Sequence, residues 1–174
     1  FDGVAPAAKL NQQRTRRYKS WFEERVMEKI DKEYEKSFWD TASITPGTAF
    51  MHNLGVTIKR RFINEKEFGL KRLMISDPGE IGEGEHKIYD YIRKNKKEHE
   101  TTTTVIYGLD ADLIILTLNH LNIAPNMYLF RETPHFIASI DNTLNPNELY
   151  LMDIPEFSKM LALDLNDGNE PNTK

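Results

Sequence analysis

Two pairs of acidic residues are the positions in this sequence where chemistry is easiest to place. Glu83 and Glu85 belong to the run Gly-Glu-Gly-Glu-His, and Asp110 and Asp112 to the run Gly-Leu-Asp-Ala-Asp. Four carboxylates gathered in one site raise each other's pKa, and a divalent ion removes this conflict. Their hard oxygen atoms suit Mg²⁺ or Mn²⁺. The quartet therefore predicts a metal site, and clusters of this kind most often serve phosphoryl transfer.

Each acid also has a purely structural interpretation. Asp112 is a suitable N-cap for a helix that follows it, and Asp110 is a suitable turn residue. Glu85 could simply complement the positive end of its own helix. His86, which follows Glu85, is more often a helix-surface histidine than a ligand. The functional interpretation depends on all four acids occurring together.

A basic segment forms the second candidate site. Residues 9–19 contain five basic residues and no acidic one. On a helix, Lys9, Gln13, Arg16 and Arg17 share one face and could form a pocket for a terminal phosphate. The alternative is a solvated basic face, which is the more common role of a charge run. Asp2, just upstream, could place a fifth carboxylate near the metal site.

Regular elements that could position these residues follow from the residue pattern. We expect helices over residues 9–39, 45–62, 85–97 and 112–120, with Thr45 as the N-cap of the second, and strands over residues 70–76, 102–109 and 127–131. Alternating strands and helices predict an α/β fold with a mostly parallel sheet covered on both faces. Sites in such sheets lie beyond the carboxyl ends of the strands, where Asp77, Glu83 and Asp110 fall. We expect one domain over residues 1–165 and a polar, disordered tail over residues 166–174.

Composition narrows the function further. The 174 residues are 39% hydrophobic, carry a net charge of −4 and include no cysteine, which excludes disulfides and thiolate zinc sites. No apolar run reaches the length of a membrane span, so we expect no membrane association. These features are compatible with an intracellular protein and do not distinguish nucleus from cytoplasm. The sequence contains no P-loop, GxSxG or GxGxxG motif.

Four blocks of this sequence, in this order, resemble the XRN family of 5′→3′ exoribonucleases. The first comprises Asp2-Gly3-Val4-Ala5-Pro6, Lys9 and the run from Asn11 to Arg17. The others are Ile44-Thr45-Pro46-Gly47-Thr48 with Phe50-Met51, then residues 82–88, then residues 107–114. Residues 149–154 are similar to a strand and helix start in the same region. The blocks together make chance agreement improbable.

The resemblance implies a FEN/PIN-like nuclease core with a Rossmann-like sheet, acting on RNA with a 5′-monophosphate and releasing mononucleotides. It implies two Mg²⁺ or Mn²⁺ ions, one activating the attacking water and the other stabilising the leaving 3′ oxygen. The implied metal-site acids, which would be catalytic, are Asp2, Glu83, Glu85, Asp110 and Asp112. The implied 5′-phosphate pocket is Lys9, Gln13, Arg16 and Arg17.

The sequence also departs from the family pattern. It begins within the first block, and the family has further metal ligands before and after this chain; Ala7 and Ala49 replace residues more usual there. We therefore expect a fragment that works with other segments of a parent nuclease, and the sequence leaves its activity in isolation open. Two alternatives remain: a non-catalytic fragment that binds the 5′-phosphate of RNA, and a FEN-like nuclease acting on DNA.

Overall fold

The structure is a computed structural model that describes residues 1–31, 33–35, 39–131, 139–145 and 147–169. The chain forms two compact units, Phe1–Lys87 and Ile88–Lys174, and the boundary between them falls within one helix. Within the described residues, no helix combines the length and apolar character that a membrane span requires.

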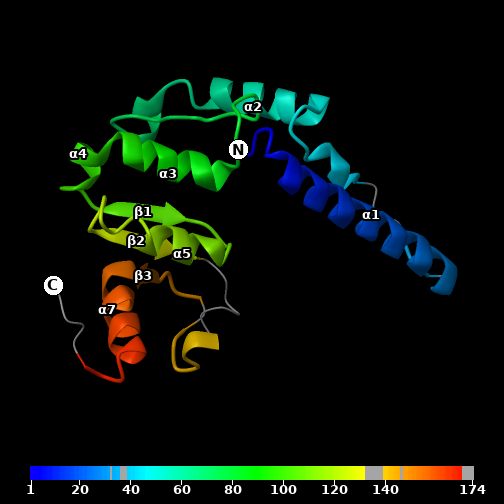
Figure 1. The fold of residues 1–174 in the computed structure, drawn as a ribbon. Helices are drawn as coiled ribbons and strands as arrows, with labels where there is room; N and C mark the ends of the chain where they lie inside the picture. Colours follow the sequence, from blue (N-terminus) through cyan, green and yellow to red (C-terminus); the bar gives the residue numbers. More distant parts are fainter. Residues whose placement is uncertain (32, 36–38, 132–138, 146, 170–174) are drawn as a thin grey trace. The chain divides into compact units, whose positions relative to one another are not determined.

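A single long helix, α1 (Ala7–Ile30), dominates the first unit (Figure 1). Pro6 precedes it, and the helix is rich in Gln, Glu, Lys and Arg, which favour helix. It buries none of its side chains. The predicted extension to Trp39 is wrong: the carboxylate of Asp31 accepts the N–H of Glu33 at 2.9 Å and starts a turn instead. Residues 32 and 36–38 of the predicted range lie outside the described residues.

The next helix, α2 (Ala49–Arg61), starts later than the sequence indicated. Thr48 is its N-cap, accepting the N–H of Met51 at 3.3 Å, so the prediction of Thr45 as the cap is wrong. Gly47 is the reason, because its φ of +89° is a left-handed turn conformation that no α-helix contains. Two short 3₁₀ turns, η1 (Thr41–Ser43) and η2 (Glu65–Phe68), flank α2.

The strand expected over residues 70–76 is not formed in the described part of the chain. The segment has no regular structure, and the N–H of Leu73 donates to the carboxylate of Glu65 at 3.1 Å rather than to another strand. Its apolar residues resemble a strand in sequence, but a strand also requires a neighbour that supplies backbone hydrogen bonds.

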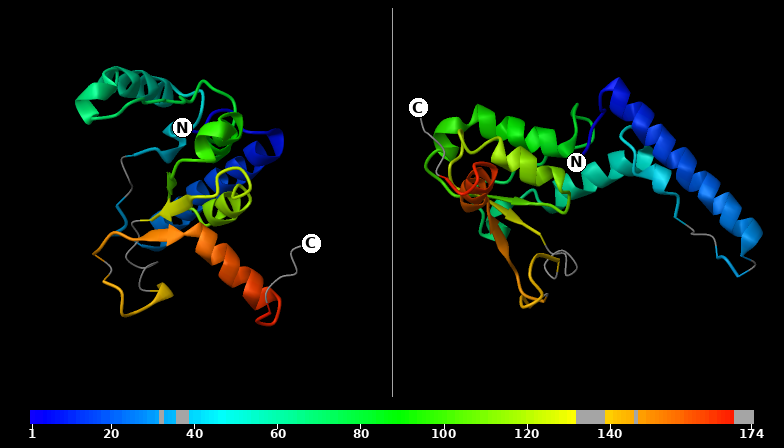
Figure 2. Two further views of the ribbon diagram at one scale, coloured as in Figure 1. Left: turned by 90° about the vertical axis from the view of Figure 1, so that its left-hand side faces the viewer. Right: turned by 60° about the horizontal axis from the view of Figure 1, so that its bottom comes forward.

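The second unit contains a mixed three-stranded sheet in the order β1-β2-β3 (Figure 2). β1 (Thr104–Tyr107) pairs in parallel with β2 (Met127–Phe130), and β2 pairs antiparallel with β3 (Leu151–Asp153). The helices are α3 (Gly84–Lys94), α4 (Lys96–His99), α5 (Asp112–Leu118) and α7 (Ile154–Leu165). The α/β character is confirmed, but the described sheet is mixed rather than mostly parallel.

Helices α5 and α7 contact each other and β2. Thr104 and Ile106 of β1 are buried, whereas Val105 and Tyr107 are 49% and 59% exposed. The expectation of a sheet covered on both faces is therefore wrong for β1 in the described structure. The helix predicted over residues 85–97 is divided at Asn95, whose backbone φ of −111° and ψ of 33° leave the helical region between α3 and α4.

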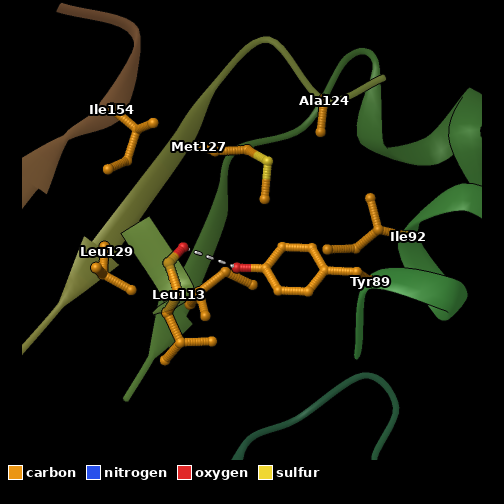
Figure 3. Close-up of a cluster of buried hydrophobic side chains, with 8 residues drawn as sticks. Tyr89, Ile92, Leu113, Ala124, Met127, Leu129 and Ile154 are labelled. Carbon is orange, nitrogen blue, oxygen red and sulfur yellow. Dashed lines mark hydrogen bonds between the residues drawn. The ribbon is translucent and has the colours of Figure 1, made fainter. Parts of the chain in front are cut away.

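The core of this unit surrounds Tyr89 of α3, shown in Figure 3. Its ring is fully buried and packs on His120 with centroids 4.6 Å apart. Its hydroxyl lies 2.7 Å from Oγ1 of Thr117 and 3.3 Å from the carbonyl of Leu113. The other buried members are Ile92, Ile106, Leu113, Ala124, Met127, Leu129 and Ile154. This core holds β1, and with it the loop that carries Asp110.

Helix α7 has a side-chain cap at its start and hydrogen-bonded turns after its end. Asp153 caps α7 by accepting the N–H of Glu156 at 2.9 Å, with Pro155 in the first turn. This confirms the strand and helix start expected over residues 149–154. Residues 166–169 form hydrogen-bonded turns, with the N–H of Gly168 donating to Leu163 at 2.8 Å, and residues 170–174 of the predicted tail lie outside the described chain.

A matched pair of isoleucine substitutions tests this core. Ile92→Ala should lower the free energy of unfolding by about 2–5 kcal/mol, because Ile92 is only 2% exposed and its loss leaves a cavity. Ile115→Ala, on a side chain that is 58% exposed, should change it by less than about 0.5 kcal/mol. Urea denaturation measures both, and equal effects would contradict the described core.

Candidate metal centre and phosphate pocket

The N-terminal segment lies against the loop that precedes α3. The N–H of Gly3 donates to the carbonyl of Gly82 at 2.8 Å, and the N–H of Gly82 donates to Val4 at 3.1 Å. A Cβ on residue 3 would lie 1.6 Å from the carbonyl oxygen of Glu80. Only glycine permits this approach, which fixes the position of Asp2.

Asp2 lies at the start of α3. Its Oδ1 accepts the N–H of Gly84 at 2.6 Å. The first amides of a helix lack partners within the helix, and a carboxylate there is favoured by the helix dipole. The hydrogen bond places Asp2 beside Gly84, which lies between Glu83 and Glu85 in the sequence. The predicted role of Asp2 as a fifth carboxylate of a metal site stays a prediction.

Glu83, Glu85 and His86 form a compact group at the same helix start. One ligand atom from each lies within 4.8 Å of the others, and the two glutamates are half-buried while His86 is exposed. Two carboxylates and an imidazole are a donor set that fits a divalent cation. His86 is therefore a stronger candidate ligand than its sequence context indicated. The only signal for it was its position next to Glu85.

Lys9 connects this acidic group with the basic face of α1. Its Nζ lies 2.9 Å from Oε2 of Glu83. The hydrogen bond with Glu83, followed by the charge of that carboxylate, raises the pKa of Lys9. A lysine that the sequence assigns to phosphate binding is thus paired with an acid assigned to metal binding, so the two candidate sites adjoin in the first unit.

The other predicted pocket residues follow Lys9 along α1. Gln13 and Arg17 are half-buried and Arg16 is exposed. At about 100° per residue, these three and Lys9 fall within an arc of about 100° on the helix. The helix that the prediction required is present, and the phosphate-binding role of the four residues stays a prediction.

Asp110 and Asp112 belong to the second unit and lie three and five residues after the end of β1. Both are exposed, and Oδ1 of Asp110 accepts the N–H of Asp112 at 3.1 Å. Asp112 is the first residue of α5 and is not its N-cap. The convergence of this pair with Glu83 and Glu85 stays a prediction, because the pairs lie in different units.

Arg131 is a charged neighbour of Asp110 that the sequence analysis did not identify. Its guanidinium donates to the carbonyl of Leu109, just before Asp110. Because β1 and β2 are parallel, the residues following each strand meet at one edge of the sheet. The position of Arg131 at the end of a predicted strand was the available signal.

Asp77, also expected near the site, has a structural role. It forms an ion pair with Lys59 of α2, and it accepts the N–H of Gly79 at 2.8 Å. The hydrogen bond from Lys59 is the main cause that lowers the pKa of Asp77. The pair therefore stabilises the fold at neutral pH, and this stability is lost as the pH falls through the lowered pKa.

Comparison with known proteins bears on this arrangement. The family model described as XRN 5′-3′ exonuclease N-terminus matches residues 1–133, which include Asp2, Lys9 and both acidic pairs. Proteins named 5′-3′ exoribonuclease 2 are also similar. The one from Eremothecium gossypii is 36% identical over 194 residues, covering 98% of this chain and 20% of that protein.

Two further relatives carry the same name. The protein from Candida glabrata is 38% identical over 184 residues, with 92% of this chain and 18% of that protein covered. The protein from Saccharomyces cerevisiae is 42% identical over 140 residues, with 67% and 14% covered. The chain spans about a fifth or less of the length of these relatives. The family match confirms the resemblance, and the chain belongs to the XRN family of 5′-3′ exonucleases, to its N-terminal part.

Proposed function

We propose that this chain is the N-terminal part of a 5′→3′ exoribonuclease that hydrolyses RNA bearing a 5′-monophosphate and releases mononucleotides. The observation that supports this best is the ion pair between Lys9 and Glu83. It joins a cation suited to a terminal phosphate with an acid suited to a metal ion, within the segment that matches the exonuclease family.

The residues have separate roles in this proposal. Asp2, Glu83, Glu85, Asp110 and Asp112 would hold Mg²⁺ or Mn²⁺, and His86 is an added candidate. Two bound ions would activate water and stabilise the leaving 3′ oxygen. Lys9, Gln13, Arg16 and Arg17 would hold the 5′-phosphate, fix the register of cleavage at one nucleotide and leave no room for a bulky cap.

The proposal extends to the fold and the setting. The described sheet would be part of a Rossmann-like, FEN/PIN-like core that other segments of the parent nuclease complete. The parent protein would act inside the cell, in the nucleus or the cytoplasm, with RNA as its substrate.

A second candidate function is a fragment that binds the 5′-phosphate without catalysis. The location of the four proposed phosphate-binding residues on the single helix α1 favours it, because phosphate binding there does not require Asp110 and Asp112 of the second unit. Binding that prefers a 5′-monophosphate over a 5′-hydroxyl, with no product in Mg²⁺ or Mn²⁺, would identify this function.

A time course on 3′-labelled, 5′-monophosphorylated RNA distinguishes the two functions. The exoribonuclease proposal expects shortening from the 5′ end with Mg²⁺ and none with EDTA. Single-stranded DNA of the same sequence serves as the control for substrate class. Equal degradation of the DNA would contradict the assignment to RNA.

Replacing Asp110 tests the metal site with little cost to the fold. Asp110→Asn should lower the rate of cleavage at least about a hundredfold. Replacing a residue that only orients a metal ligand costs about 10–100-fold, and Asp110 is proposed to be a ligand itself. RNA binding should persist, and Mn²⁺ affinity, followed by electron paramagnetic resonance, should fall. Asparagine keeps an oxygen to accept the N–H of Asp112.

Asp141→Asn is the matched control for that variant. Asp141 makes the same local contact, accepting the N–H of Thr143 at 2.8 Å, but lies far along the chain from the acidic pairs. Its replacement should leave cleavage and Mn²⁺ affinity unchanged. A normal rate of RNA degradation by Asp110→Asn would remove Asp110 from the site.

Replacing Lys9 should have opposite effects on the two ligands. Lys9→Gln removes a positive charge beside Glu83, so Mn²⁺ affinity should rise about threefold or more. The preference for 5′-monophosphorylated over 5′-hydroxyl RNA should fall. Lys19→Gln, which removes a cation paired with Glu23 at 3.6 Å, is the control and should change neither quantity. A fall in Mn²⁺ affinity with Lys9→Gln would contradict the proposal that Lys9 competes with the metal ion for Glu83.

A further inference from the structure

A second face of α1 carries aromatic and basic residues that the proposed 5′-phosphate pocket does not use. Arg14, Tyr18, Trp21 and Arg25 follow one another at spacings of four, three and four residues. At about 100° per residue they fall within an arc of about 60°, centred on the order of 120° away from the arc of Lys9, Gln13 and Arg17. We call these four residues the α1 stripe.

The rings of the stripe lie in solvent and contact each other. Tyr18 is 66% exposed and Trp21 48% exposed. Their ring centroids are 5.7 Å apart, and the guanidinium of Arg25 lies over the indole of Trp21 at 5.4 Å. Large rings held at the surface beside a guanidinium form a platform on which flat π systems can stack.

The charge around the stripe is suited to a polyanion. Arg14 and Arg25 lie at its two ends, and Lys29 continues it one turn further. Two acids flank the stripe, Glu24 three residues after Trp21 and Glu28 three residues after Arg25. The stripe is about 16 Å long, at 1.5 Å per residue. That length matches roughly four or five nucleotides stacked at about 3.4 Å each.

We propose that the α1 stripe binds the body of a single-stranded RNA, with bases stacked on Tyr18 and Trp21 and phosphates paired with Arg14 and Arg25. Aromatic platforms beside cations are how proteins hold single strands without reading their sequence. The choice of RNA among polyanions rests on the proposed function. The stripe itself requires no metal ion and no 5′-phosphate, so it is a binding site separate from the cleavage machinery.

Tryptophan fluorescence tests the proposal directly, because the sequence has only two tryptophans. Trp39→Phe keeps a ring beside Phe50, which packs edge-on to Trp39 at 5.0 Å, and leaves Trp21 as the sole reporter. In this background, a 5′-hydroxyl polyuridine oligonucleotide in EDTA should quench Trp21 saturably. Binding should weaken as salt rises, with a slope that becomes smaller when a phosphate contact is removed.

Substitutions within the stripe should weaken this binding. Tyr18→Ala should lower affinity at least about fivefold, as expected for loss of one stacked base. The double variant Arg14→Gln, Arg25→Gln should lower affinity and reduce the magnitude of the salt slope by about 1.4, since each phosphate contact to a single strand contributes about 0.7. Lys19→Gln, on a different side of the same helix, is the control and should lower affinity by less than Tyr18→Ala does. Circular dichroism confirms that α1 persists in each variant.

Two results would overturn the proposal. One is the absence of saturable quenching, or quenching that the stripe variants leave unchanged. The other is self-association of the chain that depends on Tyr18 and Trp21 and occurs without RNA binding, which would make the stripe a protein interface. The fluorescence assay uses 5′-hydroxyl RNA and EDTA, so it is independent of the cleavage assay. A lack of binding in it would not contradict the proposed nuclease function, and a lack of cleavage would not contradict RNA binding by the α1 stripe.

Discussion

The hydrogen bond between the carboxylate of Asp2 and the amide of Gly84 is the contact on which the first unit's site depends. It joins residues 82 positions apart, and the approach of the two segments requires glycine at position 3, where a Cβ would lie 1.6 Å from the carbonyl oxygen of Glu80. At position 84 a Cβ would lie 3.1 Å from the carboxylate oxygen. Together with the two backbone hydrogen bonds that join Gly3 and Val4 to Gly82, this contact holds Lys9 at the start of α1 near the glutamates at the start of α3. Gly3, a residue without a side chain, is therefore needed for the charged residues of the two segments to meet.

The charges at this position explain one another. Glu83 and Glu85 are close enough to repel, and the ammonium of Lys9 offsets part of that repulsion. A divalent ion would satisfy the same carboxylates more completely. The ion pair between Lys9 and Glu83 would then weaken, and the ammonium of Lys9 could bind a different anion. A terminal phosphate is such an anion, so in the proposed function metal binding and phosphate binding would favour each other through Lys9.

The sequence predicted contacts that are local and missed those that depend on distant partners. The helix start at Ile154 was expected from the family resemblance of residues 149–154, and α5 from the pattern of residues 112–120. Residues 70–76 were predicted as a strand from their apolar pattern, but pairing depends on a neighbour that the pattern does not encode. The N-cap of α2 is Thr48, three residues later than the predicted Thr45, because Gly47 between them adopts a left-handed conformation. Both threonines are suitable N-caps, and the sequence alone does not show which one is used.

In the candidate site, too, the sequence predicted local features and missed a contact between distant residues. Motifs identified the acids and the basic face, but the ion pair of Lys9 with Glu83 joins residues 74 positions apart, and no local pattern predicts it. Helix α1 illustrates the consequence for function. It buries none of its 24 residues, so core packing does not determine which residues its surface carries. With two cationic faces on the order of 120° apart, the nucleotide whose phosphate lies at Lys9 cannot also stack on Trp21. The α1 stripe can therefore contact only nucleotides further along the strand, where it would affect how long RNA is retained rather than how it is cut.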